Sequence, residues 1–389
     1  MTQPQQVVVV GPRLGDDTVT LKVVTTFWSG WTDVRITRGI ERMPGDFTIT
    51  LTELYPDNAD RLNIQPGDEC EVWIGTTTKP TNRVLTGYVD RHSPGISAGM
   101  HSVTISGRGK CQDLVDCSAE WPGQQIIASS VLDVAQKLAA PFGITAKGTP
   151  GPAVGQGGSI IPVLNMMIGE TPWEIIEKIC RVAALLPYEL ADGSLRIVED
   201  PGAHAGPVVG LGFKQGVNVQ SAHATFSADQ RFKRYRAFFF SWDPLKGARI
   251  EEEPIATEVD ESVKRYRPKD IVAEMTHGLG EDVAKRRTKW EMTRRFGRSR
   301  VVQLTTDSWR GSTGELHAPG TIVRIDLPAL KLDAVEWMVS EVTFRKSEGG
   351  GTQCDITAMP KEAFSVQPVL PLPGLPWELA KLGQRPVKP

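Results

Sequence analysis

The stretch Pro66-Gly-Asp-Glu-Cys-Glu-Val-Trp-Ile74 decides the fold, because Pro319-Gly-Thr-Ile-Val-Arg-Ile-Asp-Leu327 repeats its pattern near the C-terminal end. Each stretch opens with a Pro-Gly turn signal and continues with apolar residues at every second position, which is typical of a strand with one buried face. Two further alternating segments follow each stretch. The sequence therefore predicts one antiparallel meander over 66–106 and another over 319–359.

The two meanders also agree in spacing, and nearly all of their difference in length lies in one loop. This agreement predicts an internal duplication. The alternative is coincidence, because any two meanders share alternation and Pro-Gly turns. Counted from the Pro-Gly turns, the expected equivalent residues are Ile49 and Val302, Leu51 and Leu304, Val72 and Ile325, Val89 and Val342, Val103 and Cys354, and Ile105 and Ile356.

The composition is that of an ordinary soluble globular protein, with 389 residues, 40% hydrophobic and 23% charged, which allows two to four domains. The formal net charge of −2 does not support a general nucleic-acid or membrane binder. No apolar run approaches the roughly 18 residues of a membrane span, and the first residues lack the pattern of a secretory signal. The five cysteines form no CxxC pair, which favours buried free thiols in a reducing cytoplasm: Cys70, Cys111, Cys117, Cys180 and Cys354.

Along the chain, the patterns predict a mainly β fold with α/β insertions. β-Branched segments before Pro66 add enough strands to the first meander to close a barrel or sandwich. Whether 235–241 or 301–305 is the second domain's counterpart of strand 47–52 stays open at this point. We expect a first antiparallel β-barrel domain at 1–110, a small α/β domain at 111–204, a similar second β-barrel domain at 205–364 with a helix-containing insertion at about 243–297, and a Pro-rich tail at 365–389.

Three helices have recognisable end signals or charge patterns. Ser129 or Ser130 can cap the first. Thr171 and Glu174 form a capping box at the start of the second, whose wide apolar stripe predicts packing on a sheet. The third is expected over 281–295, where acidic side chains precede basic ones by four residues.

No constellation of residues predicts catalysis. The six histidines show no metal-ligand spacing, and His92 and His101, which flank one hairpin loop, are expected to be ordinary loop histidines. There is no GxSxG elbow, no phosphate-binding loop and no cysteine in a nucleophile context. Paired carboxylates cannot be judged from sequence, because they need not be neighbours. We therefore predict no catalytic, cofactor-binding or metal-binding residue.

The run 285–300 is the most strongly basic segment of the chain. Its acid-to-base pairs favour a solvated helix, yet they neutralise only part of the positive charge. A solvated helix or a contact with a protein partner is favoured over nucleic acid. The candidate partner-contact patch comprises Lys285, Arg286, Arg287, Lys289, Arg294 and Arg298.

Several stretches, in order along nearly the whole chain, resemble the baseplate hub proteins of Mu-like contractile-tail phages. Related hub modules occur in the spike proteins of type VI secretion systems. No single stretch is decisive, but the ordered set is fairly specific. The stretches are Trp31-Thr-Asp-Val-Arg-Ile-Thr-Arg-Gly-Ile-Glu-Arg42, Leu85-Thr-Gly-Tyr-Val-Asp-Arg91, Ser106-Gly-Arg-Gly-Lys-Cys-Gln-Asp-Leu-Val-Asp-Cys-Ser118, Glu170-Thr-Pro-Trp-Glu174, Gly297-Arg-Ser-Arg300, Ala318-Pro-Gly-Thr-Ile-Val323 and Glu341-Val-Thr-Phe344.

The resemblance implies a homotrimeric structural hub in the virion, assembled in the host cytoplasm and lacking catalytic residues. Its implied partners are the tail tube protein, the central spike protein and other baseplate proteins. A membrane is not an expected partner, and nucleic acid is not favoured. The predicted duplication suits this role, because three chains with two similar β-domains each can place six equivalent units around a ring.

Two other functional classes remain as alternatives. One is a tail-associated peptidoglycan hydrolase, although such an activity would be expected on an appended domain and few residues follow the second meander. The other is a carbohydrate- or receptor-binding β-protein that uses Trp28, Trp31 and Trp309. Trp28 and Trp31, which flank Gly30, are favoured as a core plug over a ligand platform.

Overall fold

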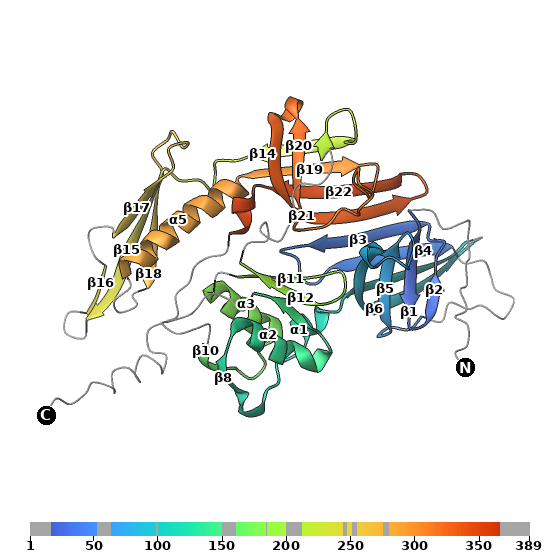
Figure 1. Ribbon diagram of the computed structural model, residues 1–389, viewed down its shortest axis with the longest axis horizontal. Coiled ribbons are helices and arrows are strands. Elements are labelled where there is room, and N and C mark those ends of the chain that lie inside the picture. Colours follow the sequence, from blue (N-terminus) through green and yellow to red (C-terminus); the bar gives the residue numbers. More distant parts are fainter. Residues whose placement is uncertain are drawn as a thin grey trace.

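The computed structural model describes residues 17–52, 64–98, 100–149, 161–183, 185–199, 212–243, 247–250, 255–274 and 280–365. It confirms the mainly β class, with most strands in one large sheet and three smaller sheets beside it (Figure 1). The Pro-rich tail beyond Ser365 lies outside the described residues. Short 3-10 helices join several elements: η1 (Pro80–Asn82), η2 (Pro122–Gln124), η3 (Ala140–Phe142), η4 (Pro328–Leu330) and η5 (Lys361–Phe364).

The first half of the large sheet, which we call module 1, contains the first predicted meander. Its hydrogen-bonded strand order is β3-β4-β7-β6-β5-β1-β2. Alternating apolar side chains on these strands point into one core, as their period-2 pattern predicts. The strands are β1 (Val19–Val23), β2 (Thr26–Trp28), β3 (Asp33–Gly39), β4 (Asp46–Thr52), β5 (Glu69–Ile74), β6 (Arg83–Ser97) and β7 (Met100–Gly109).

The second half of the sheet, module 2, repeats this order as β14-β19-β22-β21-β20-β13. The last strand differs, since β13 runs parallel to β20 whereas β1 runs antiparallel to β5. Strands β3 and β21 join the modules edge to edge, so the described strands follow an open path instead of closing two separate barrels. Module 2 consists of β13 (Phe213–Lys214), β14 (Ser221–Phe226), β19 (Arg300–Thr306), β20 (Ile322–Leu327), β21 (Leu332–Ser347) and β22 (Gly351–Met359).

Backbone hydrogen bonds at the Pro-Gly turns identify the equivalent residues of β6 and β21. In module 1, the Gly67 N–H donates to the carbonyl of Val89 at 2.7 Å, and the Val89 N–H donates to Asp68 at 2.9 Å. In module 2, the Gly320 N–H donates to the carbonyl of Val339 at 2.8 Å, and the Val339 N–H donates to Thr321 at 2.9 Å. Val89 is therefore equivalent to Val339, and the predicted match with Val342 is wrong.

The wrong match has a physical cause in the loops and bulges. The connection between β20 and β21 is shorter than that between β5 and β6. Counting the same number of residues from each Pro-Gly turn therefore ends at a residue of β21 that lies beyond the true equivalent of Val89. A β-bulge follows both Val89 and Val339 and resets the alternation. Val342, beyond the bulge, is consequently buried as well, which makes it a plausible but incorrect partner.

Cross-strand pairing settles the other expected matches. Ile105 lies opposite Ile49, and Ile356 lies opposite Leu304, which makes Ile49 equivalent to Leu304 and not to Val302. The predicted matches in β4 are thus two residues out of register, a shift that leaves the buried face unchanged. The match of Val72 with Ile325 and both matches between β7 and β22 are confirmed by the same pairing.

A small α/β unit follows module 1. The predicted capping box is present at Thr171, and Ser130, one of the two serines considered, caps the first helix in a capping box with Asp133. The second helix packs on the hairpin β11–β12, in agreement with its predicted packing on a sheet. Its helices are α1 (Gln112–Asp116), α2 (Val131–Ala139) and α3 (Pro172–Val182), and its strands are β8 (Gln125–Ser129), β9 (Ala146–Gly148), β10 (Ile161–Asn165), β11 (Leu186–Glu189) and β12 (Leu195–Val198).

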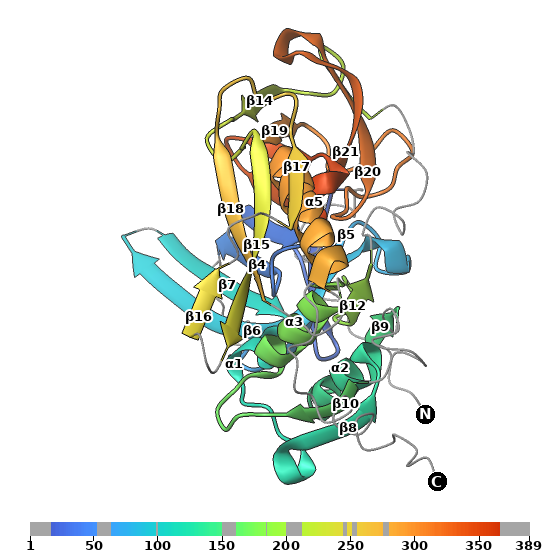
Figure 2. The same ribbon diagram turned by 90° about the vertical axis from the view of Figure 1, so that its left-hand side faces the viewer.

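An insertion separates β14 from β19 and forms an arm beside module 2 (Figure 2). It comprises a four-stranded sheet covered by α5, and it starts directly after β14, earlier than the predicted position 243. The open question about 235–241 is thereby answered, because that segment belongs to the arm and β19 is the counterpart of β4. The arm consists of β15 (Arg234–Asp243), β16 (Gly247–Ile250), β17 (Ala256–Val259), β18 (Pro268–Glu274) and α5 (Gly280–Arg298).

Candidate functional site

The seam between the modules is an internal interface formed by strand pairing. Residues 341–346 of β21 pair antiparallel with residues 34–39 of β3. On one face of this seam the hydroxyl oxygens of Thr343 and Thr37 lie 3.2 Å apart and are buried. On the other face Phe344 lies opposite Ile36 inside the core that both modules share. The chain therefore contains a complete example of how one module joins another.

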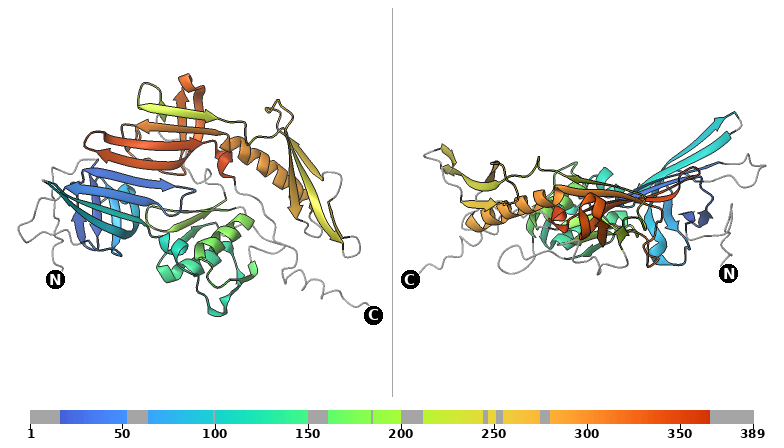
Figure 3. Two further views of the ribbon diagram at one scale, coloured as in Figure 1. Left: turned by 180° about the vertical axis from the view of Figure 1, so that it is seen from behind. Right: turned by 90° about the horizontal axis from the view of Figure 1, so that it is seen from above.

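The strands equivalent to this seam each have a stretch with no pairing strand on one side among the described residues. Strand β14, the counterpart of β3, is the last strand of the path and pairs only with β19 among the described strands. In β6, the counterpart of β21, residues 91–97 pair with β7 on one side, while β5 ends its pairing at Tyr88. This part of the β6–β7 hairpin projects from the body (Figure 3, right). Large apolar side chains are exposed on both edges, at 77% for Ile96 and 52% for Phe226.

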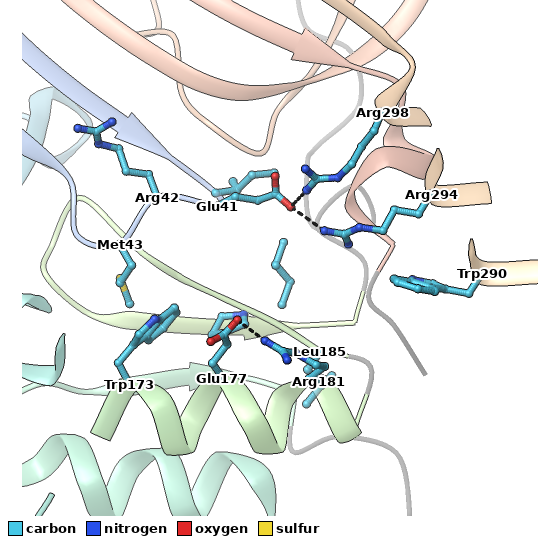
Figure 4. Close-up of a pocket in the computed structure, with 13 residues that line it drawn as sticks. Glu41, Arg42, Met43, Trp173, Glu177, Arg181, Leu185, Trp290, Arg294 and Arg298 are labelled. Atoms are coloured by element: carbon cyan, nitrogen blue, oxygen red, sulfur yellow. Dashed lines mark hydrogen bonds and ion pairs between the residues drawn. The ribbon is translucent and has the colours of Figure 1, made fainter. Parts of the chain in front are cut away.

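A groove of about 470 Å³ lies where module 1, the α/β unit and the arm meet (Figure 4). It is lined by the turn after β3, by α3 and by α5. In its centre Glu41 accepts hydrogen bonds from Arg298 and, at 3.4 Å, from Arg294. On its opposite wall Arg181 pairs with Glu177 at 2.7 Å. The groove is rich in guanidinium groups, and most of them already have a partner within the chain.

The end of α5 is tied to the chain that follows module 2. The carbonyl of Ser365 accepts hydrogen bonds from the Trp290 indole at 2.9 Å and from Arg294 at 2.7 Å. Burial lowers the pKa of Arg294, and the positive charge of Arg298 lowers it further, while Glu41 acts in the opposite direction. The C-terminal half of α5 is thus fixed against the body. Gly297 allows this close contact, because a side chain there would collide with the backbone of Ala363.

The structure distributes the predicted partner-contact patch over different environments. Arg294 and Arg298 hold the arm to Glu41, and Arg287 lies over the Trp290 ring at 5.1 Å. Lys285 and Lys289 are exposed. The side chain of Arg286 lies outside what the structure describes. The described members of the patch therefore lie in different environments. Glu291 and Arg295, which are four residues apart on α5, form an ion pair at 2.7 Å, in agreement with the acid-to-base spacing expected for this helix.

A buried carboxylate that the sequence patterns did not indicate joins module 1 to the α/β unit. The two oxygens of Glu189 accept backbone N–H groups of Gly45 at 3.0 Å and Cys111 at 2.9 Å. Burial raises the pKa of Glu189, and these hydrogen bonds oppose the shift. A side chain at Gly109 would occupy the position of this carboxylate. The glycine is the only trace of this contact in the sequence, and it does not reveal which side chain approaches it.

The described part of the chain holds no candidate metal centre. No group of three or more His, Cys, Asp or Glu side chains there could hold a metal ion. His92 lies opposite Ile105 and His101 lies opposite Ile96, so the two histidines stand at different levels of the hairpin and do not meet. Within the same residues, no helix is long and apolar enough to cross a membrane.

Two of the three tryptophans considered for carbohydrate binding are buried. Trp31 belongs to the shared core, as the core-plug interpretation predicts. Trp309 is fully buried, and its indole N–H donates to the carbonyl of Gln353 at 2.8 Å. Trp28 is partly buried against the same core. A glycan platform made from all three side chains is therefore incompatible with the fold.

Comparison with known proteins gives three family matches in chain order. They are Mu phage baseplate assembly protein GpP-like, N-terminal, at residues 18–109, baseplate hub protein gp44-like, second domain, at 111–199, and Mu phage baseplate assembly protein GpP, fourth domain, at 280–367. The chain is 26% identical over 355 residues to baseplate hub protein gp44 of Escherichia phage Mu, which covers 90% of this chain and 89% of that protein.

Solved structures agree with these matches. The 43 kDa tail protein of prophage MuSo2 from Shewanella oneidensis is 28% identical, with a TM-score of 0.72, over 90% of this chain and all of that one. A type VI secretion component from E. coli, the c3393 protein, is 10% identical, with a TM-score of 0.54, over 90% of this chain and 79% of that one, and shares the fold.

Two joined β-modules, together with these matches, define a structural protein of a phage tail. Within that class, the chain belongs to the family of Mu-like phage baseplate hub proteins. Its role is that of a structural component of the tail baseplate in a virion.

Proposed function

We propose that three copies of the chain form the baseplate hub as a ring in which module 1 and module 2 alternate. The ring is three-fold in its chains and nearly six-fold in its modules, so it adapts a six-fold tail tube to a three-fold central spike. The tube protein binds one face of the ring, and the spike and other baseplate proteins bind elsewhere. The hub is assembled in the host cytoplasm, and it acts by joining proteins and not by catalysis.

The observation that carries this proposal is the structural equivalence of the two modules. Six successive strands have the same order in both, and the Pro-Gly turn makes the same pair of hydrogen bonds to Val89 and to Val339. Bulges follow at the same place. Three chains then supply six similar units, which is what a mismatch between six-fold and three-fold partners requires.

The organisation of the chain fits the same assignment. We propose that the β-modules, at 1–110 and 205–364, form the ring, while the α/β unit at 111–204 and the arm inserted after β14 contact other baseplate proteins. The tail at 365–389 serves as a partner-binding strap. The exposed Lys285 and Lys289 on α5 remain candidates for a protein contact.

Native mass spectrometry of the purified chain tests the ring directly. A trimer is expected, and electron micrographs of its end-on views should show six similar densities. A monomer or dimer at micromolar concentration would contradict the proposal. Zymography on bacterial cell walls tests the alternative of a peptidoglycan hydrolase, for which a clear lytic band would be required.

A further inference from the structure

We propose that residues 366–373 of the Pro-rich tail occupy the groove between module 1, the α/β unit and the arm as a polyproline II segment. The inference concerns the single chain and does not depend on the ring. It refines the proposed strap, because it assigns the first part of the tail to the chain's own groove and leaves 374–389 for partner proteins. The groove volume of about 470 Å³ lies within the range of ligand clefts, roughly 300–1,000 Å³.

The tail starts at the groove itself. The carbonyl of Ser365, the last described residue, accepts hydrogen bonds from the Trp290 indole at 2.9 Å and from Arg294 at 2.7 Å, and both of these side chains line the groove. The backbone angles of Ser365, φ −58° and ψ 129°, are close to those of polyproline II. The chain therefore leaves η5 beside the groove in this conformation, and residues 366–373 follow it directly.

The sequence of the segment favours polyproline II and makes it rich in hydrogen-bond acceptors. Pro368 and Pro371 give the PxxP spacing of segments that dock in aromatic-lined grooves in this conformation. Three of the eight residues at 366–373 are proline, so the segment has eight carbonyls and five backbone N–H groups. Polyproline II has no internal hydrogen bonds, and its carbonyls therefore need donors from water or from a protein surface.

The groove offers the complementary surface. Its lining includes the partly exposed apolar side chains of Met43, Trp173 and Leu186. Trp173 and Trp290 lie at opposite ends of this lining (Figure 4). Each guanidinium group of the lining has five N–H donors, more than its carboxylate partner uses. The groove thus combines aromatic and apolar area with spare donors, and the contact of Trp290 and Arg294 with Ser365 shows how these donors bind a carbonyl of the chain.

The charges of the groove favour a neutral occupant over an acidic one. Each of the four guanidinium groups in the lining pairs with a carboxylate: Arg42 with Asp46 and Glu341, Arg181 with Glu177, and Arg294 and Arg298 with Glu41. Their positive charge is therefore compensated within the chain, while N–H donors remain. Residues 366–373 carry no charged side chain. An uncharged segment rich in carbonyls fits this surface better than an acidic peptide does.

The geometry of polyproline II determines which residues of the segment to change. The helix has three residues per turn, so its side chains form three ridges. Leu370 and Leu372 lie on different ridges, and each ridge is apolar except at Gln367. A segment that packs with two of its ridges in a groove therefore buries at least one of these two leucines. Changing both removes the apolar contact whichever way the helix is rotated.

Hydroxyl-radical footprinting of the full chain tests the occupant. Mass spectrometry measures the oxidation of Met43 and Trp173 in the groove, with Met167, a 73% exposed residue of the α/β unit outside it, as the reference. In Leu370→Asp/Leu372→Asp, oxidation of both groove residues should rise at least about threefold, because charge disfavours packing on the apolar lining. Oxidation of Met167 should stay unchanged. Equal oxidation of the groove residues in this variant and in the wild-type chain would overturn the proposal.

Val387→Asp, the same kind of change in the tail beyond the proposed segment, is the matched control and should leave the footprint unchanged. Protection of the groove in the wild-type chain should persist between about 0.05 and 0.5 M NaCl, because a neutral segment is not released by ionic screening. Loss of protection at high salt would overturn the proposal in favour of an ionic occupant.

Native mass spectrometry of the same proteins separates this inference from the ring. Both tail variants are expected to form the same oligomer as the wild-type chain. Loss of the trimer in Leu370→Asp/Leu372→Asp alone would overturn the proposal, because it would place the segment between copies. Absence of trimers in every protein would overturn the ring, while the footprint would still decide whether the tail occupies the groove.

Discussion

Module 1 and module 2 share a strand order but differ in what covers their equivalent positions. Pro94 and Phe344 occupy the same place in the two modules, yet Pro94 is exposed and Phe344 is fully buried. The difference arises because β3 covers the edge of β21, whereas no described strand covers this part of β6. The comparison shows that the same position in a module is buried where a neighbouring strand pairs with that edge and exposed where none of the described strands does.

The modules also differ in what is built onto them. Module 1 leads directly into the α/β unit, which is fixed to it through Glu189. Module 2 carries the arm between two neighbouring strands and holds the short strand β13 in the parallel orientation. A common sheet therefore serves as a platform, and the attachments distinguish its two copies.

The largest expected effect concerns the position shared by Pro94 and Phe344. Phe344→Ala should lower the free energy of unfolding by about 3–5 kcal/mol, because it leaves a cavity beside Trp309, whose ring centroid lies 6.0 Å away. Pro94→Ala, the matched change in module 1, should alter it by less than ~0.5 kcal/mol. Urea unfolding at concentrations that keep the chain monomeric measures both. Similar losses for the two variants would show that the edges are covered alike.

A smaller effect is expected at Glu189, which fixes the α/β unit to module 1. Glu189→Gln replaces one of two acceptor oxygens with a donor, so the N–H of Gly45 or Cys111 loses its partner inside the interface. A loss of about 1–3 kcal/mol in unfolding free energy is expected. The control Glu177→Gln, in an exposed helical ion pair, should cost less than ~0.5 kcal/mol. A loss no larger than that of the control would mean that Glu189 does not hold the units together.

Lowering the pH should destabilise module 2 more than module 1 because of His317. The ring of this residue packs on Phe213 of β13, with 5.3 Å between the ring centroids. Burial lowers the pKa of His317 to about 4, below its unfolded value of about 6.5. The unfolded state therefore binds the extra proton in this window, and the contribution to stability falls as the pH falls from about 6.5 to 4.

His317→Phe should remove that part of the pH dependence, while His92→Phe, on the β6–β7 hairpin of module 1, serves as the control. Comparing unfolding free energies at pH 7 and pH 4.5 isolates the difference from the protein's other titrations. An unchanged pH dependence in His317→Phe would indicate that the imidazole titrates normally in the folded protein.

The smallest effect is expected from making each module more like the other at its core cysteine. Cys70 of β5 is equivalent to Val323, and Cys354 of β22 is equivalent to Val103. Cys70→Val and Cys354→Val each enlarge a buried side chain by about one methyl group, which the other module accommodates at the equivalent position, and should each cost less than about 1.5 kcal/mol. Thermal melts check this, and a large loss at either site would show that the two cores are packed differently despite the shared strand order.

Much of the fold is predictable because its signals are local. The Pro-Gly turns followed by alternation specify the strands, and the capping boxes at Ser130 and Thr171 specify where two helices begin. Which residues of the two modules are equivalent is harder to predict from the sequence. A loop difference and a bulge move the true partner of Val89 to Val339, and sequence spacing cannot separate it from Val342, which is also apolar and buried.

The sequence by itself determined the mainly β class, the two meanders that open with Pro-Gly turns and the family resemblance, because alternation, turn residues and ordered motifs are carried by neighbouring residues. Only the tertiary structure decided that β3 joins β21, that Glu189 and Glu41 hold separate units together, and that Ile96 and Phe226 lie on strand edges that no described strand covers. These contacts join residues that are distant along the chain. They depend on how complete elements pack, which no local pattern encodes.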